Sequence, residues 1–175
     1  MENALYKSIN IPTEYYRMAF LLMLMIGLVH FCVKRKVAIS AAWGILSGYL
    51  FLIFSTTVLA RDAKPEYDYD FELFWSYSAI KAGREDLLFL NIANLLMLMP
   101  VGFLIGCIGV ARYRWVTLIG VGISGVIEFA QLLLKRGMFE FDDIFHNALG
   151  CVVGYLIYRV FKWVREKMRW VINGK

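Results

Sequence analysis

A carboxylate in the middle of an apolar run is the side chain in this sequence best placed to do chemistry. Residues 115–134 are almost entirely apolar and about long enough to cross a lipid bilayer, yet they contain Glu128 and Gln131. Inserting a charge at that depth costs about 2.5 kcal/mol or more, so such residues usually face other helices or a wet cavity and serve a function. Glu128 is therefore the first candidate for a functional residue.

Helical spacing groups further polar residues around Glu128. Ser124, Glu128 and Gln131 are separated by four and then three residues, which places them on one face of a helix. Two other apolar segments repeat this arrangement with a pair of polar residues on one face, namely Asn91 with Asn94, and Asp143 with Asn147. Three segments thus each present a polar face, and we expect these faces to meet.

Asp142 and Asp143 stand where the last apolar segment begins. A carboxylate at a helix start accepts backbone N–H bonds and complements the helix dipole, so capping alone explains one of them. Two acids followed by His146 and Asn147 exceed what a cap needs. One interpretation is a metal site formed by Asp143, His146 and Glu128, with or without Asp142. We favour the other, in which His146 only forms hydrogen bonds and no metal or other cofactor is bound.

Arg61 closes the second apolar segment and is the natural partner of these acids. Because an ion pair keeps a carboxylate charged, we expect Arg61 to pair with Glu128 or with one of the two aspartates. The candidate catalytic residues are Glu128, Asp143 and Arg61. The candidate ligand-binding residues are Asn91, Asn94, Ser124, Gln131, Asp142, His146 and Asn147.

The elements that position these side chains are membrane-spanning helices. Of the 175 residues, 60% are hydrophobic and only 19% charged, and the mean hydropathy is +0.60, all outside the usual range of a soluble domain. Five apolar segments are long enough to cross a bilayer, and they cover residues 16–33, 37–60, 87–111, 115–134 and 144–164. The sequence predicts a single domain, an all-α polytopic bundle of about five helices.

Two pairs of glycines predict that some of these helices pack closely. Gly102 and Gly106 lie four residues apart, as do Gly150 and Gly154. Small residues at this spacing let helix backbones approach one another in lipid. We expect both pairs to serve ordinary tight packing.

Charge in the connections predicts the orientation in the membrane. Residues 34–36, residues 112–114 and the segment after residue 161 are basic, and five spans place all three on one side. The positive-inside rule makes that side the cytoplasm, so the N-terminus is expected outside and the C-terminus inside. Residues 159–175 then form a basic amphipathic tail on the inner leaflet. The net charge of +5 follows from this bias, and we do not expect nucleic-acid binding.

Four short motifs follow one another between residues 40 and 160. They are Thr56-Thr-Val-Leu-Ala-Arg61, Asn94-Leu-Leu-Met-Leu-Met-Pro100-Val-Gly102, the Ser124/Glu128/Gln131 stripe, and Asp142-Asp143 followed by Asn147, Gly150 and Gly154. In order and spacing these motifs resemble the VanZ family. One departure is the loop stretch at residues 71–76, where the family often has Asn-Leu-x-Pro-Phe. The resemblance implies a multi-pass cell-membrane protein whose relatives lower susceptibility to teicoplanin-type lipoglycopeptides.

The favoured hypothesis is a polar cavity, open to the outer leaflet, that binds or helps to modify an envelope component. Its partners would be membrane lipids and a lipid-linked cell-wall precursor or a lipoglycopeptide. The main alternative is a membrane-embedded enzyme in which Glu128 or Asp143 acts as acid or base and Arg61 stabilises a phosphate or oxyanion. Transport through the bundle and a purely structural role for the polar residues are the remaining alternatives.

Overall fold

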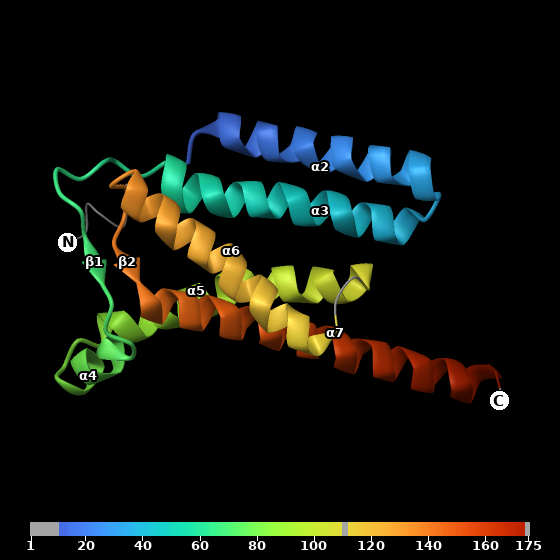
Figure 1. The fold of residues 1–175 in the computed structure, drawn as a ribbon. Helices are drawn as coiled ribbons and strands as arrows, with labels where there is room; N and C mark the ends of the chain where they lie inside the picture. Colours follow the sequence, from blue (N-terminus) through green and yellow to red (C-terminus); the bar gives the residue numbers. More distant parts are fainter. Residues whose placement is uncertain (1–10, 110–111, 174–175) are drawn as a thin grey trace.

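The structure is a computed structural model that describes residues 11–109 and 112–173. Helices make up almost all of the ordered elements (Figure 1). In chain order the elements are α2 (Thr13–Lys34), α3 (Val37–Phe54), the π-helix η1 (Ser55–Leu59), β1 (Tyr69–Asp70), α4 (Trp75–Lys81), α5 (Asp86–Ile108), α6 (Tyr113–Leu133), β2 (Phe139–Glu140) and α7 (Phe141–Asn173).

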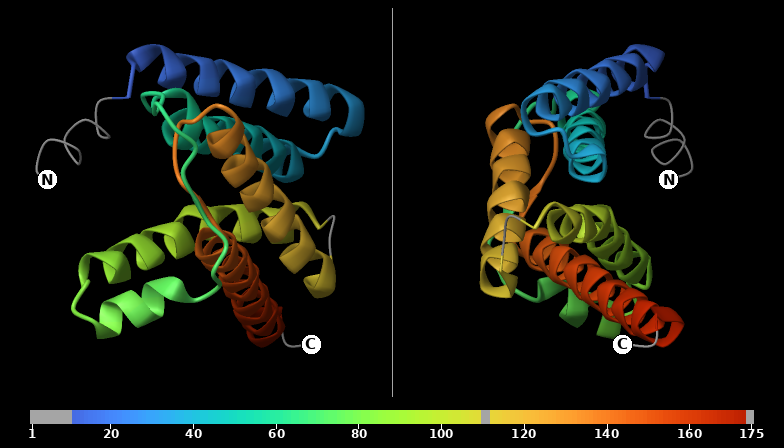
Figure 2. Two further views of the ribbon diagram at one scale, coloured as in Figure 1. Left: turned by 60° about the vertical axis from the view of Figure 1, so that its left-hand side comes forward. Right: turned by 90° about the vertical axis from the view of Figure 1, so that its right-hand side faces the viewer.

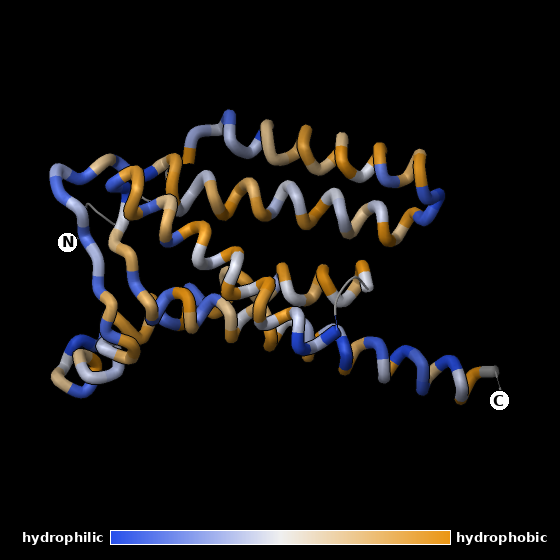
Figure 3. Tube along the Cα trace, in the orientation of Figure 1, coloured by the Kyte–Doolittle hydropathy of each residue, from blue (hydrophilic) through white to orange (hydrophobic). Residues whose placement is uncertain are grey.

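The predicted all-α membrane bundle is confirmed. Five helices are long and apolar enough to cross a membrane, namely α2, α3 with η1, α5, α6 and α7. Figure 3 shows apolar residues along the lengths of these helices and hydrophilic ones gathered at the ends of the molecule. The predicted boundaries hold within a few residues, except that α7 continues to Asn173. Residues 110–111, which were predicted to end the third helix, lie outside the described residues.

The helices form two groups. Figures 1 and 2 show α2 and α3 as an antiparallel pair on one side and α5 beside α7 on the other, with α6 crossing between α7 and the end of α3. The side of α3 that faces the second group contributes to a shared apolar core, and the Tyr49 hydroxyl donates a hydrogen bond of 2.9 Å to the carbonyl oxygen of Met97 in α5. Much of the surface of α2 is apolar and exposed, as expected for side chains that face lipid.

Close backbone contact between α5 and α7 depends on glycine. A Cβ atom added at Gly102 of α5 would overlap the carbonyl oxygen of Cys151 in α7. One added at Gly150 or Gly154 of α7 would overlap the carbonyl oxygens of Leu95 and Met99 in α5. The spacing of four residues repeats once per helical turn, so one side of each helix is kept free of side chains. These contacts fit the packing role predicted from the spacing of the glycines.

The loops lie at the two ends of the bundle. Strands β1 and β2 pair in parallel, with Tyr69 opposite Phe139, and they join the two longest connections at the end where α4 also lies (Figure 1). The connection between α2 and α3 lies at the opposite end, where α7 extends past the other helices as one continuous helix (Figure 1). We call the end with α4, β1 and β2 the strand end, and the other the tail end.

Candidate functional site

Asp142 of α7 holds α4 in place. Its carboxylate accepts hydrogen bonds from the backbone N–H groups of Phe74 and Ser76, and from the Ser76 hydroxyl at 2.5 Å. Asn91 of α5 donates to the same hydroxyl oxygen at 3.0 Å. Capping of their own helix was expected to explain one of Asp142 and Asp143. The Asp142 side chain instead supplies the N-terminal acceptor that α4 otherwise lacks. The Asp142 side chain therefore joins α7 to α4, and the Ser76 hydroxyl links both to α5.

His146, one turn further along α7, is fully engaged in the same assembly. Its Nδ1 lies 2.6 Å from the carbonyl oxygen of Asp142, and its Nε2 lies 2.8 Å from the Tyr77 hydroxyl. The Tyr77 ring stacks on the imidazole. Because both ring nitrogens have partners, His146 has none left to offer a metal. Within the described residues, no three His, Cys, Asp or Glu side chains are arranged to hold a metal ion.

Three carboxylates gather beside this assembly. Glu128 of α6 is 2% exposed and accepts a hydrogen bond of 3.2 Å from the backbone N–H of Glu140. Asp143 of α7 accepts one of 2.5 Å from the side-chain amide of Asn94 in α5. The charges of Glu128 and Glu140 each interact with that of Asp143. We call Glu128, Glu140 and Asp143 the carboxylate cluster.

Glu140, in β2, is the member that sequence reasoning missed. It accepts a hydrogen bond of 3.1 Å from the indole Nε1–H of Trp75. Burial and the nearby Asp143 raise the pKa of Glu140 to about 7, against the opposing effect of the Trp75 hydrogen bond. Its position two and three residues before Asp142 and Asp143 was the one feature of the sequence that could have indicated it as a site residue. Glu140 faces Trp75 because β2 pairs with β1, and strands of only two residues leave no pattern in the sequence that would predict this pairing.

A stability measurement tests this environment of Glu140. Between its ordinary pKa of 4.5 and the folded value of about 7, the folded state holds a proton that the unfolded chain releases. The free energy of unfolding therefore falls as pH rises through this window and stays lower above it. We expect Glu140→Gln to match the wild type at pH 4 and to be more stable at pH 8, by about 1 kcal/mol after allowance for solvent screening. Thermal unfolding in detergent at both pH values measures this, and equal stability at pH 8 would contradict it.

Arg61 does not form the predicted ion pair. Among the ion pairs of the described residues, none joins Arg61 to Glu128, Asp142 or Asp143. The residue lies in the turn after η1 and is exposed. Its charge still acts at longer range on Glu128 and Asp143. The guanidinium is exposed, and moving it against a buried carboxylate would carry a desolvation cost.

Three predicted site residues are buried and tie helices together. Asn147 of α7 donates a hydrogen bond of 2.9 Å to the Ser124 hydroxyl of α6, and both side chains are 0% exposed. The Asn147 Oδ1 is buried with no hydrogen-bond partner among the described residues. Gln131 of α6 donates to the carbonyl oxygen of Thr57 in η1 at 3.1 Å. These contacts stabilise the bundle beneath the carboxylate cluster.

The π-helix η1 creates one of these contacts. Its wider turns alter the backbone hydrogen bonding of α3 just before Arg61, and such segments occur often at functional sites. Two of its carbonyl oxygens accept hydrogen bonds from side chains outside η1. The Thr57 oxygen accepts one from Gln131, and the Leu59 oxygen accepts one of 2.6 Å from Arg136. The segment thereby fixes the end of α3 against α6 and sets the position of Arg61.

The polar candidates thus divide by accessibility. Asp143, Asn94 and Glu140 are partly exposed and Arg61 is exposed, whereas the other candidates are buried and hydrogen-bonded. The four exposed or partly exposed side chains are the accessible members of the candidate site. Hydrogen bonds join the sequence candidates in separate groups: Asp142 with His146 and, through Ser76, Asn91; Asn94 with Asp143; and Ser124 with Asn147. Glu128 and Gln131 bond to Glu140 and Thr57 instead.

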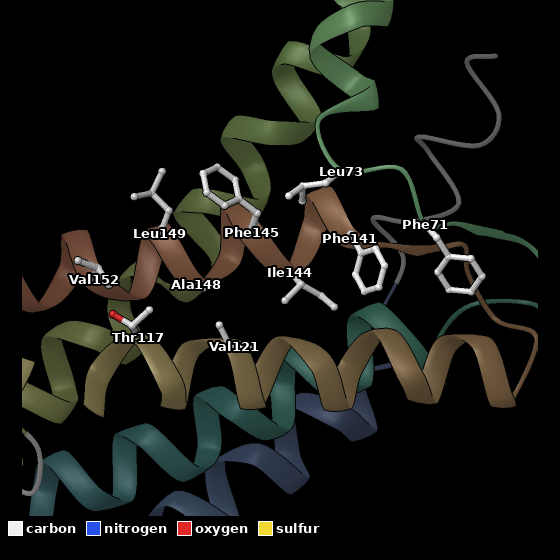
Figure 4. A pocket seen from close by; sticks show the side chains of 10 residues that line it. All are labelled: Phe71, Leu73, Thr117, Val121, Phe141, Ile144, Phe145, Ala148, Leu149 and Val152. Carbon is white, nitrogen blue, oxygen red and sulfur yellow. The ribbon is translucent and has the colours of Figure 1, made fainter. Parts of the chain in front are cut away.

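An apolar groove runs beside this region between α6 and α7 (Figure 4). Its volume is about 620 Å³ and its walls are almost entirely apolar. Phe141, Ile144 and Phe145 line it from the turns of α7 that also carry Asp142 and Asp143, and Val121 lines it from α6. An apolar chain in this groove would lie along α7, next to the carboxylate cluster.

Comparison with known proteins identifies a family for this chain. A family model described as VanZ/LLP1 matches residues 18–162, which include every polar residue of the candidate site. No curated protein and no solved structure matches the chain.

Proposed function

Because this chain belongs to the VanZ/LLP1 family, we propose that this multi-pass membrane protein acts on the cell envelope from the outer leaflet. In this proposal the carboxylate cluster and its neighbours bind the polar head of an envelope component. The component is a lipid-linked cell-wall precursor or a lipoglycopeptide. The expected consequence is lower susceptibility of the cell to teicoplanin-type lipoglycopeptides.

The proposal requires the strand end to face outward. Basic side chains of the α2–α3 connection and of the extension of α7 lie at the tail end, and Arg112 and Arg114 lie at the start of α6. An excess of Lys and Arg is typical of the cytoplasmic side, which would place the N-terminus outside and the C-terminus in the cytoplasm. The strand end would then meet the space in which envelope precursors are assembled.

The observation that carries the proposal is the convergence of the carboxylate cluster, from α6, β2 and α7, next to the exposed Arg61. Carboxylates and the Asn94 amide recognise hydroxyl and ammonium groups, and Arg61 adds a donor for a phosphate or carboxylate. Such mixed chemistry suits a head rich in sugar hydroxyls, amines and phosphate. It does not suit a simple hydrocarbon or a nucleic acid.

The apolar groove between α6 and α7 supports a ligand with a lipid tail. Its volume is about 620 Å³, and it is lined by residues such as Phe145, Ala148 and Leu149. A tail there would gain the free energy of burying apolar surface, while the head stayed at the strand end. Both the lipid-linked precursor and the lipoglycopeptide carry such a chain.

Binding by the accessible carboxylate provides the test. We expect Asp143→Asn to weaken binding of a purified lipid-linked precursor by about tenfold, because a charged hydrogen bond is replaced by a neutral one. Glu128→Gln should retain part of the binding, since the amide oxygen can still accept the Glu140 N–H. Glu66→Gln, an exposed acid at the same end, is the control. Unchanged affinity and unchanged teicoplanin susceptibility in Asp143→Asn would exclude the cluster.

An enzymatic role is the second candidate, favoured by the electrostatic interaction between Glu128 and Asp143. Two neighbouring carboxylates can share one proton, so that one acts as acid while the other acts as base. Arg61 would then stabilise charge that develops on a phosphate or oxyanion. If the protein is an enzyme, Glu128→Gln should abolish turnover of the bound precursor and leave the affinity for it intact. If the protein only binds the precursor, the wild type shows no turnover.

A further inference from the structure

A second pocket lies at the tail end, far along α7 from the carboxylate cluster. It occupies about 410 Å³ between the end of α5 and the extension of α7. Its polar walls are formed by α7, through Tyr155, Tyr158, Arg159, Lys162, Trp163 and Glu166, and the α5 side is formed by Gly106 and Gly109. The apolar groove of Figure 4 offers no such lining.

Positive charge in this pocket is largely uncompensated. Arg159 and Lys162 are three residues apart and so project from one side of the helix. Arg159 makes no hydrogen bond or ion pair with any described residue. Lys162 has only Glu166, at 3.9 Å, and both side chains are well exposed, so that pair contributes little. The charge of Arg165 reaches Cys107 near the end of α5, which adds a third cation on this side.

Arg159 and Lys162 do not serve to cap the C-terminus of α5. Basic side chains near a helix C-terminus often bond its last carbonyl oxygens. Here α5 ends at Gly109, whose left-handed backbone (φ 77°) returns its N–H to the carbonyl oxygen of Ile105 at 3.0 Å. In the described chain no hydrogen bond runs from Arg159 or Lys162 to those carbonyls. Both cations are exposed and so remain open to an anion from outside the chain, with Glu166 as the one acid among the lining residues.

The aromatic walls place this anion at the level of lipid headgroups. Tyrosine and tryptophan concentrate where the apolar core of a membrane meets water. A Cβ atom at Gly106 would overlap the ring of Tyr158, so this glycine seats the ring at the pocket wall. Val160 and Phe161 of the same helix are exposed and apolar, so acyl chains have a surface beside the pocket.

We propose that this pocket binds the phosphate of an anionic phospholipid, with Arg159 and Lys162 as its ligands. Arg159 can donate two parallel hydrogen bonds to phosphate oxygens, while Lys162 supplies a second charge. The proposal is independent of the function assigned to the strand end.

Native mass spectrometry of the full chain with equal amounts of phosphatidylglycerol and phosphatidylcholine tests the proposal. We expect the wild type to retain phosphatidylglycerol at least about fivefold more than phosphatidylcholine. Arg159→Gln combined with Lys162→Gln should abolish this preference. Lys34→Gln combined with Arg35→Gln removes the same two charges at the same end, outside the pocket, and should keep it.

Three results would overturn the proposal. A wild type with no preference would show that the pocket does not select anionic lipid. Equal losses in the two double variants would show diffuse attraction to the membrane surface rather than a site. Displacement of phosphatidylglycerol by millimolar inorganic phosphate would identify a soluble phosphate compound as the ligand. Thermal unfolding of each variant without lipid separates a loss of binding from a loss of fold.

Discussion

Replacing Gly150 with alanine is expected to prevent the native packing of α5 against α7. The new Cβ atom would overlap the backbone carbonyl of Leu95, and backbone cannot move aside as a flexible side chain can. Separating two helices along their length also opens the contacts at Gly102 and Gly154. We expect a loss of at least about 3 kcal/mol in the free energy of unfolding, seen as little monodisperse protein in detergent and a much lower melting temperature.

Two other glycines provide matched controls for this prediction. A Cβ atom added at Gly122 or Gly125 of α6 meets nothing within 4 Å. Because alanine favours a helix over glycine, Gly122→Ala and Gly125→Ala should leave stability unchanged or raise it by up to about 1 kcal/mol. If Gly150→Ala behaved like these controls, the close contact between α5 and α7 would be wrong.

Replacing Asp142 with alanine is expected to release α4 from the bundle. The change removes the acceptor for two backbone N–H groups and for the Ser76 hydroxyl, and Ser76 is 2% exposed. Leaving buried donors unpaired costs about 1–3 kcal/mol each, so the local free energy of opening should fall by about 3 kcal/mol or more. Hydrogen exchange in residues 74–81 should accelerate strongly, while exchange in α3 should stay slow.

Asp68 offers a control for the release of α4. Its carboxylate lies at the same end and pairs with Lys64 at 2.5 Å, but both side chains are well exposed. Exposed pairs contribute little, so Asp68→Ala should change stability by less than about 1 kcal/mol. Slow exchange in residues 74–81 of Asp142→Ala would mean that aromatic contacts alone hold α4, such as that between Phe74 and Phe145.

The spans and the meeting of their polar faces were predictable because both depend on local pattern. An apolar run of about 20 residues admits few structures in lipid, and helical spacing then decides which residues share a face. The pairing of Asn94 with Asp143 and of Ser124 with Asn147 follows from those faces. The glycine spacing likewise indicated the close approach of α5 and α7.

The remaining features depend on contacts between loops that no periodic pattern encodes. Asp142 caps α4 because β1 pairs with β2 and draws residues 69–76 toward the start of α7. The same pairing turns Glu140 toward Trp75. Arg61 lacks its expected partner because it lies in an exposed turn just after η1. Strands of two residues and a single π-helical turn are too short to produce a periodic pattern in the sequence.

The continuity of α7 has a mechanical consequence. At a rise of about 1.5 Å per residue, its 33 residues span about 50 Å, more than the thickness of a bilayer core. Asp143 lies in its first turn, Arg159 lies past its middle, and Gly150 and Gly154 hold it against α5 between them. The same uninterrupted helix therefore connects the strand end to the tail end, and a displacement of α7 along its axis would move both ends together.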